Sequence, residues 1–349
     1  MGFWHNKRVL VTGHTGFKGA WLCELLLGRG AHVTGLALPP EDDGSLFSRL
    51  QLKSRMPGDF VDVRDATAVS EAVKAARPEI VLHLAAQSLV RRSYRDPVGT
   101  WATNVMGTAH LLEALRSRSA PVTTVIVTTD KVYENHEWPH AYRENDALGG
   151  HDPYSASKAA TELVSASWRR SFGDDHLKIA TARAGNVIGG GDWAEDRLVP
   201  DIIRALISGR PIAIRNPASI RPWQHVLDPL HGYLLLAERL HGSNTGAPFE
   251  TAYNFGPELS DVSPVETLVE TILSHWPGKW IDAGDPSAAH EAGRLSLTIE
   301  KAKSELGWKP VWPFERAVEM TVEWYRQVAN GRDAAEICQA QIAAFETGS

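Results

Sequence analysis

A tyrosine and a lysine stand four residues apart, at Tyr154 and Lys158, just after Pro153 and at the start of a helical stretch. Residues at this spacing lie on one face of a helix, so the ammonium group can lower the pKa of the phenol. A tyrosinate formed in this way takes the proton of a hydroxyl group while a hydride leaves the same carbon. The pair is common by chance, so it predicts alcohol oxidation only together with a site for a hydride acceptor.

Three glycines, Gly13, Gly16 and Gly19, indicate such a site between an apolar run at residues 8–12 and a helical stretch at residues 20–27. Glycine permits a tight turn and lets backbone N–H groups approach a pyrophosphate at the N-terminus of the helix. A glycine triplet alone is weak evidence. Because this one lies between a predicted strand and a predicted helix, we expect it to bind a dinucleotide.

The residue that binds the adenosine ribose is harder to assign. An NAD site usually has an acidic residue near the end of the second strand, and the candidate here, Glu41, comes late. Residues 34–45 contain no Arg or Lys to receive a 2′-phosphate, which favours NAD over NADP. Asp62 and Val63, after the next strand, are candidates for contacts to the adenine ring, and a plain acidic turn explains them equally well.

A polar cluster ends the apolar run that begins at Val122, and it consists of Thr128, Thr129, Asp130 and Lys131. In an open parallel sheet, ligands lie at the carboxyl ends of the strands. We therefore expect these side chains in a cleft. The alternative is a solvated strand exit that carries an Asp–Lys surface ion pair.

Apolar runs and helical patterns alternate along the chain, which argues for a parallel sheet covered by helices on both faces. The predicted fold class is therefore a Rossmann-type, doubly wound α/β fold with a smaller mixed α/β lobe at the C-terminal end. Strands are predicted at residues 8–12, 32–38, 59–63, 80–84, 122–128, 178–182 and 252–255, and helices at residues 20–27, 66–76, 101–116, 155–171 and 230–240.

The regular alternation gives way to Gly- and Pro-rich segments after about residue 187. We expect residues 1–187 to form the dinucleotide-binding domain, with residues 226–256 returning to it. Residues 188–225 and 257–349 are then the substrate-binding lobe. The sequence after Trp324 carries no clear signal.

Composition excludes several classes of protein. The 349 residues include 42 acidic and 36 basic side chains, and the net charge of −6 argues against a broad electrostatic contact with nucleic acid. Cys23 and Cys338 are too few for a disulfide framework, and the 14 histidines show no metal-ligand spacing, so no metal is expected. No apolar run approaches the roughly 20 residues that span a bilayer. We expect a cytoplasmic protein with no membrane contact.

The chain resembles the extended short-chain dehydrogenase/reductase superfamily, and within it the nucleotide-sugar 4,6-dehydratases. The motifs that carry this resemblance are Thr12-Gly-His-Thr-Gly-Phe-Lys-Gly19, Ala85-Ala-Gln87, Thr129-Asp-Lys131 and Tyr154-x-x-x-Lys158. Longer runs are similar to the CDP-glucose 4,6-dehydratases in particular, at residues 89–94, 148–158, 182–193 and 221–226. The resemblance extends over roughly residues 7–330.

This resemblance implies a reaction without net oxidation: hydride leaves C4 of a hexose for NAD, water is lost across C5–C6, and the hydride returns to C6. Tyr154 is then the base for the C4 hydroxyl. Lys158 supports it and holds the nicotinamide ribose, while Thr129 hydrogen-bonds the same hydroxyl. Asp130 is implied as the acid that protonates the departing C6 hydroxyl, and Lys131 as the candidate base at C5.

Lys131 departs from the pattern of related dehydratases, which commonly carry Glu at this position, and the departure fits the CDP-glucose branch. A lysine must be neutral to accept a proton from C5. If Lys131 stays charged, it instead stabilises an enolate.

The candidate binding residues fall into two sets. The cofactor set is Gly13, Thr15, Gly16, Phe17, Lys18, Gly19, Asp62, Val63, Leu84, Ala85, Ala86, Gln87, Thr103, Thr128, Tyr154 and Lys158. The substrate set is Gln87, Ser88, Arg92, Asn186, Asp192, Trp193, Arg197, Arg215, Arg221 and His225. Within it, Arg215 and Arg221 are suited to a pyrophosphate, because guanidinium groups bind phosphate oxygens in a fork.

Three other functions compete with this reading. A nucleotide-sugar 4-epimerase shares the glycine loop, Thr129, Tyr154 and Lys158 but needs no acid–base pair like Asp130 and Lys131. A dehydratase for dTDP-glucose or GDP-mannose differs only in the base. A non-catalytic NAD-binding protein would not need an intact tyrosine–lysine pair. Superfamily members usually pair through two helices each, which implies a homodimer, or a dimer of dimers, through residues 101–116 and 155–171.

Overall fold

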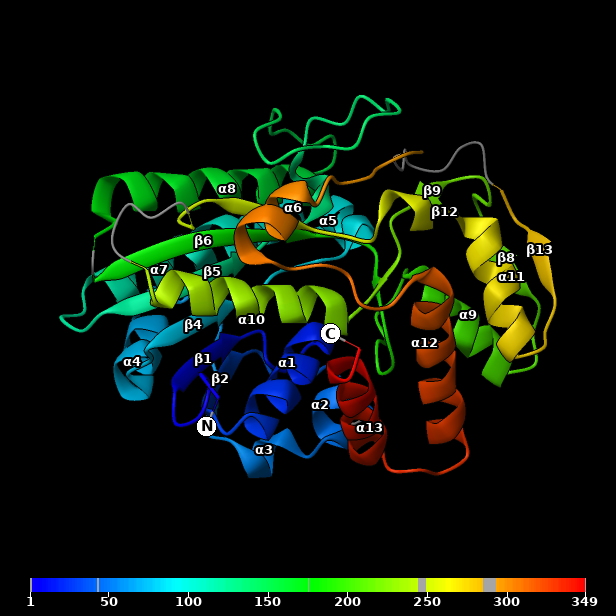
Figure 1. Ribbon diagram of the computed structural model, residues 1–349, viewed down its shortest axis with the longest axis horizontal. Coiled ribbons are helices and arrows are strands. Elements are labelled where there is room, and N and C mark those ends of the chain that lie inside the picture. Colours follow the sequence, from blue (N-terminus) through cyan, green and yellow to red (C-terminus); the bar gives the residue numbers. More distant parts are fainter. Residues whose placement is uncertain (1, 43, 175, 244–248, 285–292, 349) are drawn as a thin grey trace.

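A seven-stranded parallel sheet forms the centre of the fold in a computed structural model that describes residues 2–42, 44–174, 176–243, 249–284 and 293–348 (Figure 1). The strand order is β11-β6-β5-β4-β1-β2-β3, and every neighbouring pair is parallel. This confirms the predicted Rossmann-type sheet. The strands are β1 (Arg8–Thr12), β2 (His32–Ala37), β3 (Gly58–Phe60), β4 (Ile80–His83), β5 (Val122–Val127), β6 (Leu177–Ala184) and β11 (Ala252–Phe255).

Two layers of helices bury the faces of the sheet. Val125 and Val127 belong to the hydrophobic cluster on one face, and Ile126 between them belongs to the cluster on the other, as the alternation of a strand requires. The first face is covered by α1 (Phe17–Gly28) and α10 (Leu227–His241), and the second by α4 (Ala66–Ala76), α7 (Gly107–Arg116) and α8 (Pro153–Phe172).

The predicted helix at residues 101–116 is not one regular α-helix. It consists of α6 (Pro97–Trp101), a π-helical turn η1 (Ala102–Met106) and α7. Within the turn, the Asn104 amide donates to the Gln87 carbonyl and to the Ser157 hydroxyl, at 3.0 and 2.8 Å. The irregular turn therefore links the loop after β4 to α8. The remaining short helices of this half are α2 (Leu46–Arg49), α3 (Leu52–Arg55), α5 (Val90–Arg95) and the 3-10 turn η2 (Asp130–Val132).

A second group of elements lies beside the carboxyl ends of the strands, on the right of Figure 1. It contains three two-stranded sheets and three helices. The strands are β7 (Val187–Ile188) with β10 (Gln224–His225), β9 (Ile220–Arg221) with β12 (Ser263–Pro264), and β8 (Ile212–Ile214) with β13 (Trp280–Asp282). The helices are α9 (Leu198–Ile207), α11 (Val265–His275) and α12 (Phe314–Ala329), and the turn η3 (Leu259–Asp261) completes the set. The π-helical turn η4 (Ala302–Leu306) packs instead on β11 and α10 of the sheet domain.

The C-terminal helix α13 (Ala334–Glu346) packs against α12 of the second group and also against α1, which covers the central sheet (Figure 1). Gln339 donates to the carboxylate of Glu24 at 3.1 Å, and Arg29 pairs with Glu346 at 3.0 Å. This placement differs from the expectation that all of residues 257–349 belong to the substrate lobe. Within the described residues, no helix combines the length and apolarity that crossing a membrane requires.

Candidate active site

The glycine loop between β1 and α1 is packed too tightly for side chains at two of its three glycines. Gly13 has φ +73°, and a Cβ there would lie 2.7 Å from the backbone nitrogen of Ala85; a Cβ at Gly19 would lie 2.1 Å from the Gly13 carbonyl oxygen. A Cβ at Gly16 would meet nothing closer than 3.4 Å. Gly16 therefore leaves the N-terminus of α1 open to an anionic ligand.

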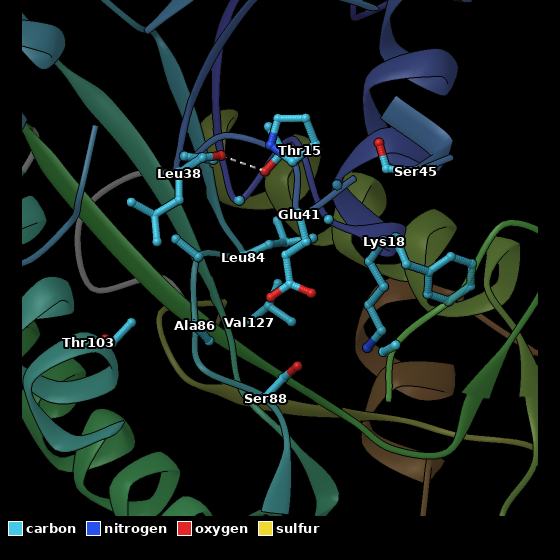
Figure 2. A pocket seen from close by; sticks show the side chains of 18 of the residues that line it. Thr15, Lys18, Leu38, Glu41, Ser45, Leu84, Ala86, Ser88, Thr103 and Val127 are labelled. Carbon is cyan, nitrogen blue, oxygen red and sulfur yellow. Dashed lines mark hydrogen bonds between the residues drawn. The ribbon is translucent and has the colours of Figure 1, made fainter. Parts of the chain in front are cut away.

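A cavity of about 460 Å³ opens at this loop, and Figure 2 shows side chains that line it. The Thr15 hydroxyl donates to the Leu38 carbonyl at 3.0 Å and so ties the glycine loop to the end of β2. All but one of the predicted cofactor residues line this cavity: Gly13, Thr15, Gly16, Phe17, Lys18, Gly19, Asp62, Val63, Leu84, Ala85, Ala86, Thr103, Thr128, Tyr154 and Lys158.

Gln87 is the exception, and it lines neither this cavity nor the second one described below. Its amide donates to Thr100 at 2.9 Å and to the Leu89 carbonyl at 3.1 Å. Gln87 therefore shapes the loop after β4 from within the protein.

The candidate ribose and adenine residues also line the cavity. Glu41 points into it in Figure 2 and pairs with Arg92 at 3.0 Å. Asp62 accepts a hydrogen bond from Nε of Arg64 at 2.9 Å, and this bond lowers the pKa of the Asp62 carboxyl. Arg64, which the sequence did not single out, lines the cavity already paired with a carboxylate.

A second cavity, of about 680 Å³, adjoins the first on the side of β7, β8 and α9. Thr129, Asp130 and Lys131 line this second cavity. Six residues line both cavities and mark where they meet: Lys18, Ser88, Tyr154, Ala184, Asp192 and Arg197. The structure thus places Tyr154 where the first cavity meets the one that Thr129, Asp130 and Lys131 line.

Tyr154 is buried in the first turn of α8. Burial raises the pKa of its phenol to about 12, and a hydrogen bond with Thr129 acts in the opposite direction. Lys158, one turn later, donates to the Val127 carbonyl at 3.0 Å, and burial lowers the pKa of its amine to about 8. The spacing predicted that Lys158 lowers the pKa of the phenol; in the structure the pKa is raised, because burial has the largest effect.

Asp130 is held by two donors from different strands. The Thr129 hydroxyl donates to its Oδ1 at 2.9 Å, and the Asn186 amide donates to its Oδ2 at 3.1 Å. Asn186 follows β6, and Asp130 begins the turn after β5, so the carboxyl ends of two adjacent strands position one carboxylate. Lys131, the next residue, is half-buried in the same cavity.

A polar bridge crosses the boundary between the cavities. Arg197 pairs with Asp192 at 2.8 Å and donates to the Ser88 hydroxyl at 2.9 Å, which joins the loop before α9 to the loop after β4. The nearby Lys18 amine is also buried. Burial, and next the charge of Arg197, lower its pKa to about 7.

The predicted substrate residues divide into three groups. Trp193 lines only the first cavity, and Gln87, Arg92 and His225 line neither. His225 packs against the ring of Trp312 with 4.6 Å between centroids, and burial lowers the pKa of its imidazole to about 3. Six residues of the set line the second cavity: Ser88, Asn186, Asp192, Arg197, Arg215 and Arg221.

Sequence reasoning missed three arginines of the second cavity, Arg91, Arg204 and Arg210. Arg91 adjoins the predicted Arg92 on α5, where consecutive residues point about 100° apart because a helix has 3.6 residues per turn. A helical projection of residues 89–94 would have separated the two, but only the structure shows which faces the cavity.

A family model described as GDP-mannose 4,6 dehydratase matches residues 10–321. The chain belongs to this family of dehydratases. A CDP-glucose 4,6-dehydratase of Salmonella typhimurium strain LT2 is 45% identical over 339 residues, which cover 95% of this chain and 94% of that protein. Tyr154, Lys158, Asp130 and Lys131 therefore lie in a chain that is similar to a dehydratase almost from end to end.

Two solved structures show the shared fold of this dehydratase and its relatives. DesIV, a dTDP-glucose 4,6-dehydratase from Streptomyces venezuelae solved with NAD, has a TM-score of 0.79 and 27% identity, and the match covers 94% of this chain and 99% of that chain. A UDP-glucose 4-epimerase from Thermus thermophilus, also with NAD, has a TM-score of 0.78 and 26% identity, with 91% and 98% covered. The fold alone does not separate dehydratase from epimerase, so the distinction depends on the site.

Proposed function

We propose that this protein is an NAD-dependent dehydratase that converts CDP-glucose to CDP-4-keto-6-deoxyglucose. The observation that carries the proposal is that Asp130 and Lys131 line the same cavity as Tyr154. An epimerase needs the tyrosine but not an acid–base pair beside it. The similarity to a CDP-glucose dehydratase over 95% of the chain supports the choice of nucleotide.

The first cavity fits NAD. Gly13 and Gly19 allow backbone contacts that side chains would block, and Gly16 leaves the end of α1 free for the pyrophosphate. Lys158 lines this cavity one helical turn after Tyr154 and is assigned to the nicotinamide half, and Thr103 and Thr128 line the same cavity. When bound, NAD supplies a hydride acceptor that later acts as a hydride donor.

The chain's own residues handle the protons of the C4 hydroxyl. The Tyr154 oxygen takes the hydroxyl proton as the C4–H bond breaks, and Thr129, which hydrogen-bonds the phenol, binds the same sugar oxygen. Lys158 is held against Val127 beside them, and its ammonium stabilises the tyrosinate. Oxidation at C4 makes the C5 proton acidic and so prepares the elimination.

Elimination of water needs a proton removed at C5 and a proton delivered to the C6 oxygen. Asp130 delivers the proton, because it lies next to Thr129 and its carboxyl is fixed by two hydrogen bonds. Lys131, which lines the same cavity, removes the C5 proton. The C5–H electrons form the C5–C6 double bond as the C6–O bond breaks and water leaves. Return of the hydride to C6 and of the proton from Lys131 to C5 then gives the 4-keto-6-deoxy sugar.

The second cavity holds the rest of the substrate. Arg215 and Arg221 bind the pyrophosphate, and Asn186, Asp192, Arg197 and Ser88 surround the sugar. Residues 1–187 supply most of the lining of the cofactor cavity, and residues 188–225 supply most of the lining of the nucleotide cavity.

The protein pairs with a second copy through α7, α8 and the turn between α6 and α7. Large apolar side chains are exposed on and next to these elements: Val98 and Trp101 on α6, Met106 in η1, and Leu163 and Phe172 on α8. Val98 is 78% exposed, and covering such a surface stabilises a dimer. Sedimentation analysis of the full chain tests this assembly, and a monomer at micromolar concentration contradicts it.

A panel of sugar nucleotides tests the proposed reaction. The purified protein is incubated with NAD and, in parallel, with CDP-glucose, dTDP-glucose, GDP-mannose and UDP-glucose, and the product masses are measured. We expect the loss of one water from CDP-glucose alone, with no net NADH. An unchanged mass with an inverted C4 centre would indicate an epimerase, and no turnover of any sugar would indicate a binding protein.

A further inference from the structure

Glu162 is a buried carboxylate that lines neither cavity, yet it lies one helical turn after Lys158 on α8. Only 4% of the residue is exposed, and three side chains donate to it. Thr128 donates to Oε1 at 2.6 Å, Thr181 donates to Oε2 at 2.7 Å, and Arg183 donates to each oxygen at 3.0 Å. Removing a carboxylate from water costs free energy, so a buried carboxylate is usually fully paired, as this one is.

These bonds attach the end of β5 to α8 at two consecutive residues. Lys158 donates to the Val127 carbonyl at 3.0 Å, and the next residue, Thr128, donates to Glu162. The residue after that, Thr129, is the one that hydrogen-bonds the catalytic phenol. The path from Glu162 to the Tyr154 phenol therefore consists of two hydrogen bonds joined by the peptide unit between Thr128 and Thr129.

Glu162 also balances the charge of Lys158. Burial lowers the pKa of the Lys158 amine, and the Glu162 carboxylate opposes that lowering. Two other titratable groups act on this lysine from neighbouring elements: His83 on β4, which is neutral because burial lowers its pKa to about 3, and Lys18 on α1, which repels it. Glu162 is thus the group that favours the charged form.

The negative charge of Glu162 is in turn compensated by Arg183 on β6. Arg183 forms a bidentate pair with it and also donates to the Tyr133 hydroxyl at 2.8 Å, and Arg169 on α8 lies within its electrostatic reach. Burial raises the pKa of the Tyr133 phenol, so Tyr133 stays neutral and Arg183 keeps its full charge.

We propose that Glu162 is a positioning residue for the oxidation of C4: its carboxylate holds the end of β5 in register with α8 and keeps Lys158 in its ammonium form. This inference rests on the proposed function. It assigns Glu162 no contact with the sugar or with NAD.

The pH profile of kcat/KM tests the charge part of the proposal, measured with NAD and CDP-glucose. Activity falls at high pH when Lys158 loses its proton. In Glu162→Gln, this limb should move to lower pH by about one unit, because a nearby opposite charge is removed. Glu162→Asp keeps the charge, so its limb should coincide with that of the wild type even if its kcat is lower. A limb that does not move in an active, folded Glu162→Gln enzyme would overturn the proposal.

A matched pair of threonine variants tests the positioning part and does not depend on Glu162→Gln folding. Thr128→Val and Thr181→Val each remove one hydrogen bond to the same carboxylate, but only Thr128 precedes Thr129. At saturating NAD, so that a change in cofactor affinity does not contribute, we expect Thr128→Val to lower kcat at least tenfold and Thr181→Val to stay within twofold. Equal losses would show that the carboxylate serves stability alone. Turnover by the wild type is measured first, since its absence would count against the proposed function and not against this inference.

Discussion

The backbone at Gly185 passes so close to Asp130 that a Cβ there would lie 1.9 Å from the Asp130 carboxyl carbon. The next residue, Asn186, donates to the same carboxyl at 3.1 Å. The chain after β6 therefore closes on the acid that follows β5, and glycine is the residue that permits this approach.

Gly185→Ala should displace the Asp130 carboxyl and lower kcat for dehydration by about tenfold or more, because small displacements of a catalytic group carry large kinetic costs. Gly28→Ala is a matched control, since a Cβ at Gly28 would meet nothing within 4 Å. Steady-state kinetics and thermal melting of both variants check this. A Gly185→Ala enzyme with wild-type kcat would show that the position of Asp130 is not critical.

Tyr154→Phe and Asp130→Asn should block different steps. Without the Tyr154 hydroxyl no base takes the C4 proton, so CDP-glucose should produce no NADH absorbance in a single turnover. Asp130→Asn should still oxidise C4 and should accumulate bound NADH with the 4-keto sugar, because the C6 hydroxyl is not protonated. Rapid-mixing absorbance separates the two results. If both variants lose NADH formation to the same degree, the division of roles is wrong.

The role of Lys131 can be separated from its charge. Lys131→Met should slow elimination by about 10²-fold or more, the usual contribution of a general base. Lys131→Glu supplies a different base at the same position and should recover part of this loss. Quenched-flow detection of the dehydrated product measures both. If Lys131→Glu is no faster than Lys131→Met, the positive charge of Lys131 is what elimination requires.

Asp228 predicts a pH dependence of stability away from the active site. Burial raises the pKa of its carboxyl from 3.8 to about 7, although Oδ1 accepts a hydrogen bond from the Val311 amide at 2.6 Å. The folded protein binds a proton that the unfolded chain releases, so stability falls as the pH rises from about 4 to about 7, by at most roughly 1.4 kcal/mol per unit.

Asp228→Asn cannot ionise and should remove this slope. Urea unfolding of both proteins at pH values from about 5 to about 8 checks the prediction. Parallel stability curves would mean that the Asp228 carboxyl titrates alike in the folded and unfolded states.

Local sequence signals predicted the sheet and most of the residues that line the two cavities, because both depend on short-range patterns. Tyr154 and Lys158 are related by one helical turn, and Thr129 and Asp130 follow a strand whose end is visible as a change from apolar to polar residues. In the structure, these residues line the two adjoining cavities, and Tyr154 lines both. The observed strand ends differ from the predicted ones by a few residues; β3, for example, was predicted at residues 59–63 and ends at Phe60.

Relationships between distant segments could not be predicted in this way. The pairing of Glu162 with Arg183 joins a helix to a strand 21 residues away, and no spacing rule connects them. His225 was predicted to bind substrate, but its side chain packs against the ring of Trp312, which is 87 residues further along the chain. The order of burial and charge effects on Tyr154 likewise depends on packing that a single sequence does not show.

The transfer of a deuterium label tests the central claim most directly. The protein is incubated with NAD and CDP-glucose that carries deuterium at C4, and the product is examined by mass spectrometry and NMR. The account predicts a product that has lost one water and carries the deuterium at C6, with no net NADH. A product of unchanged mass that retains deuterium at C4 would contradict it.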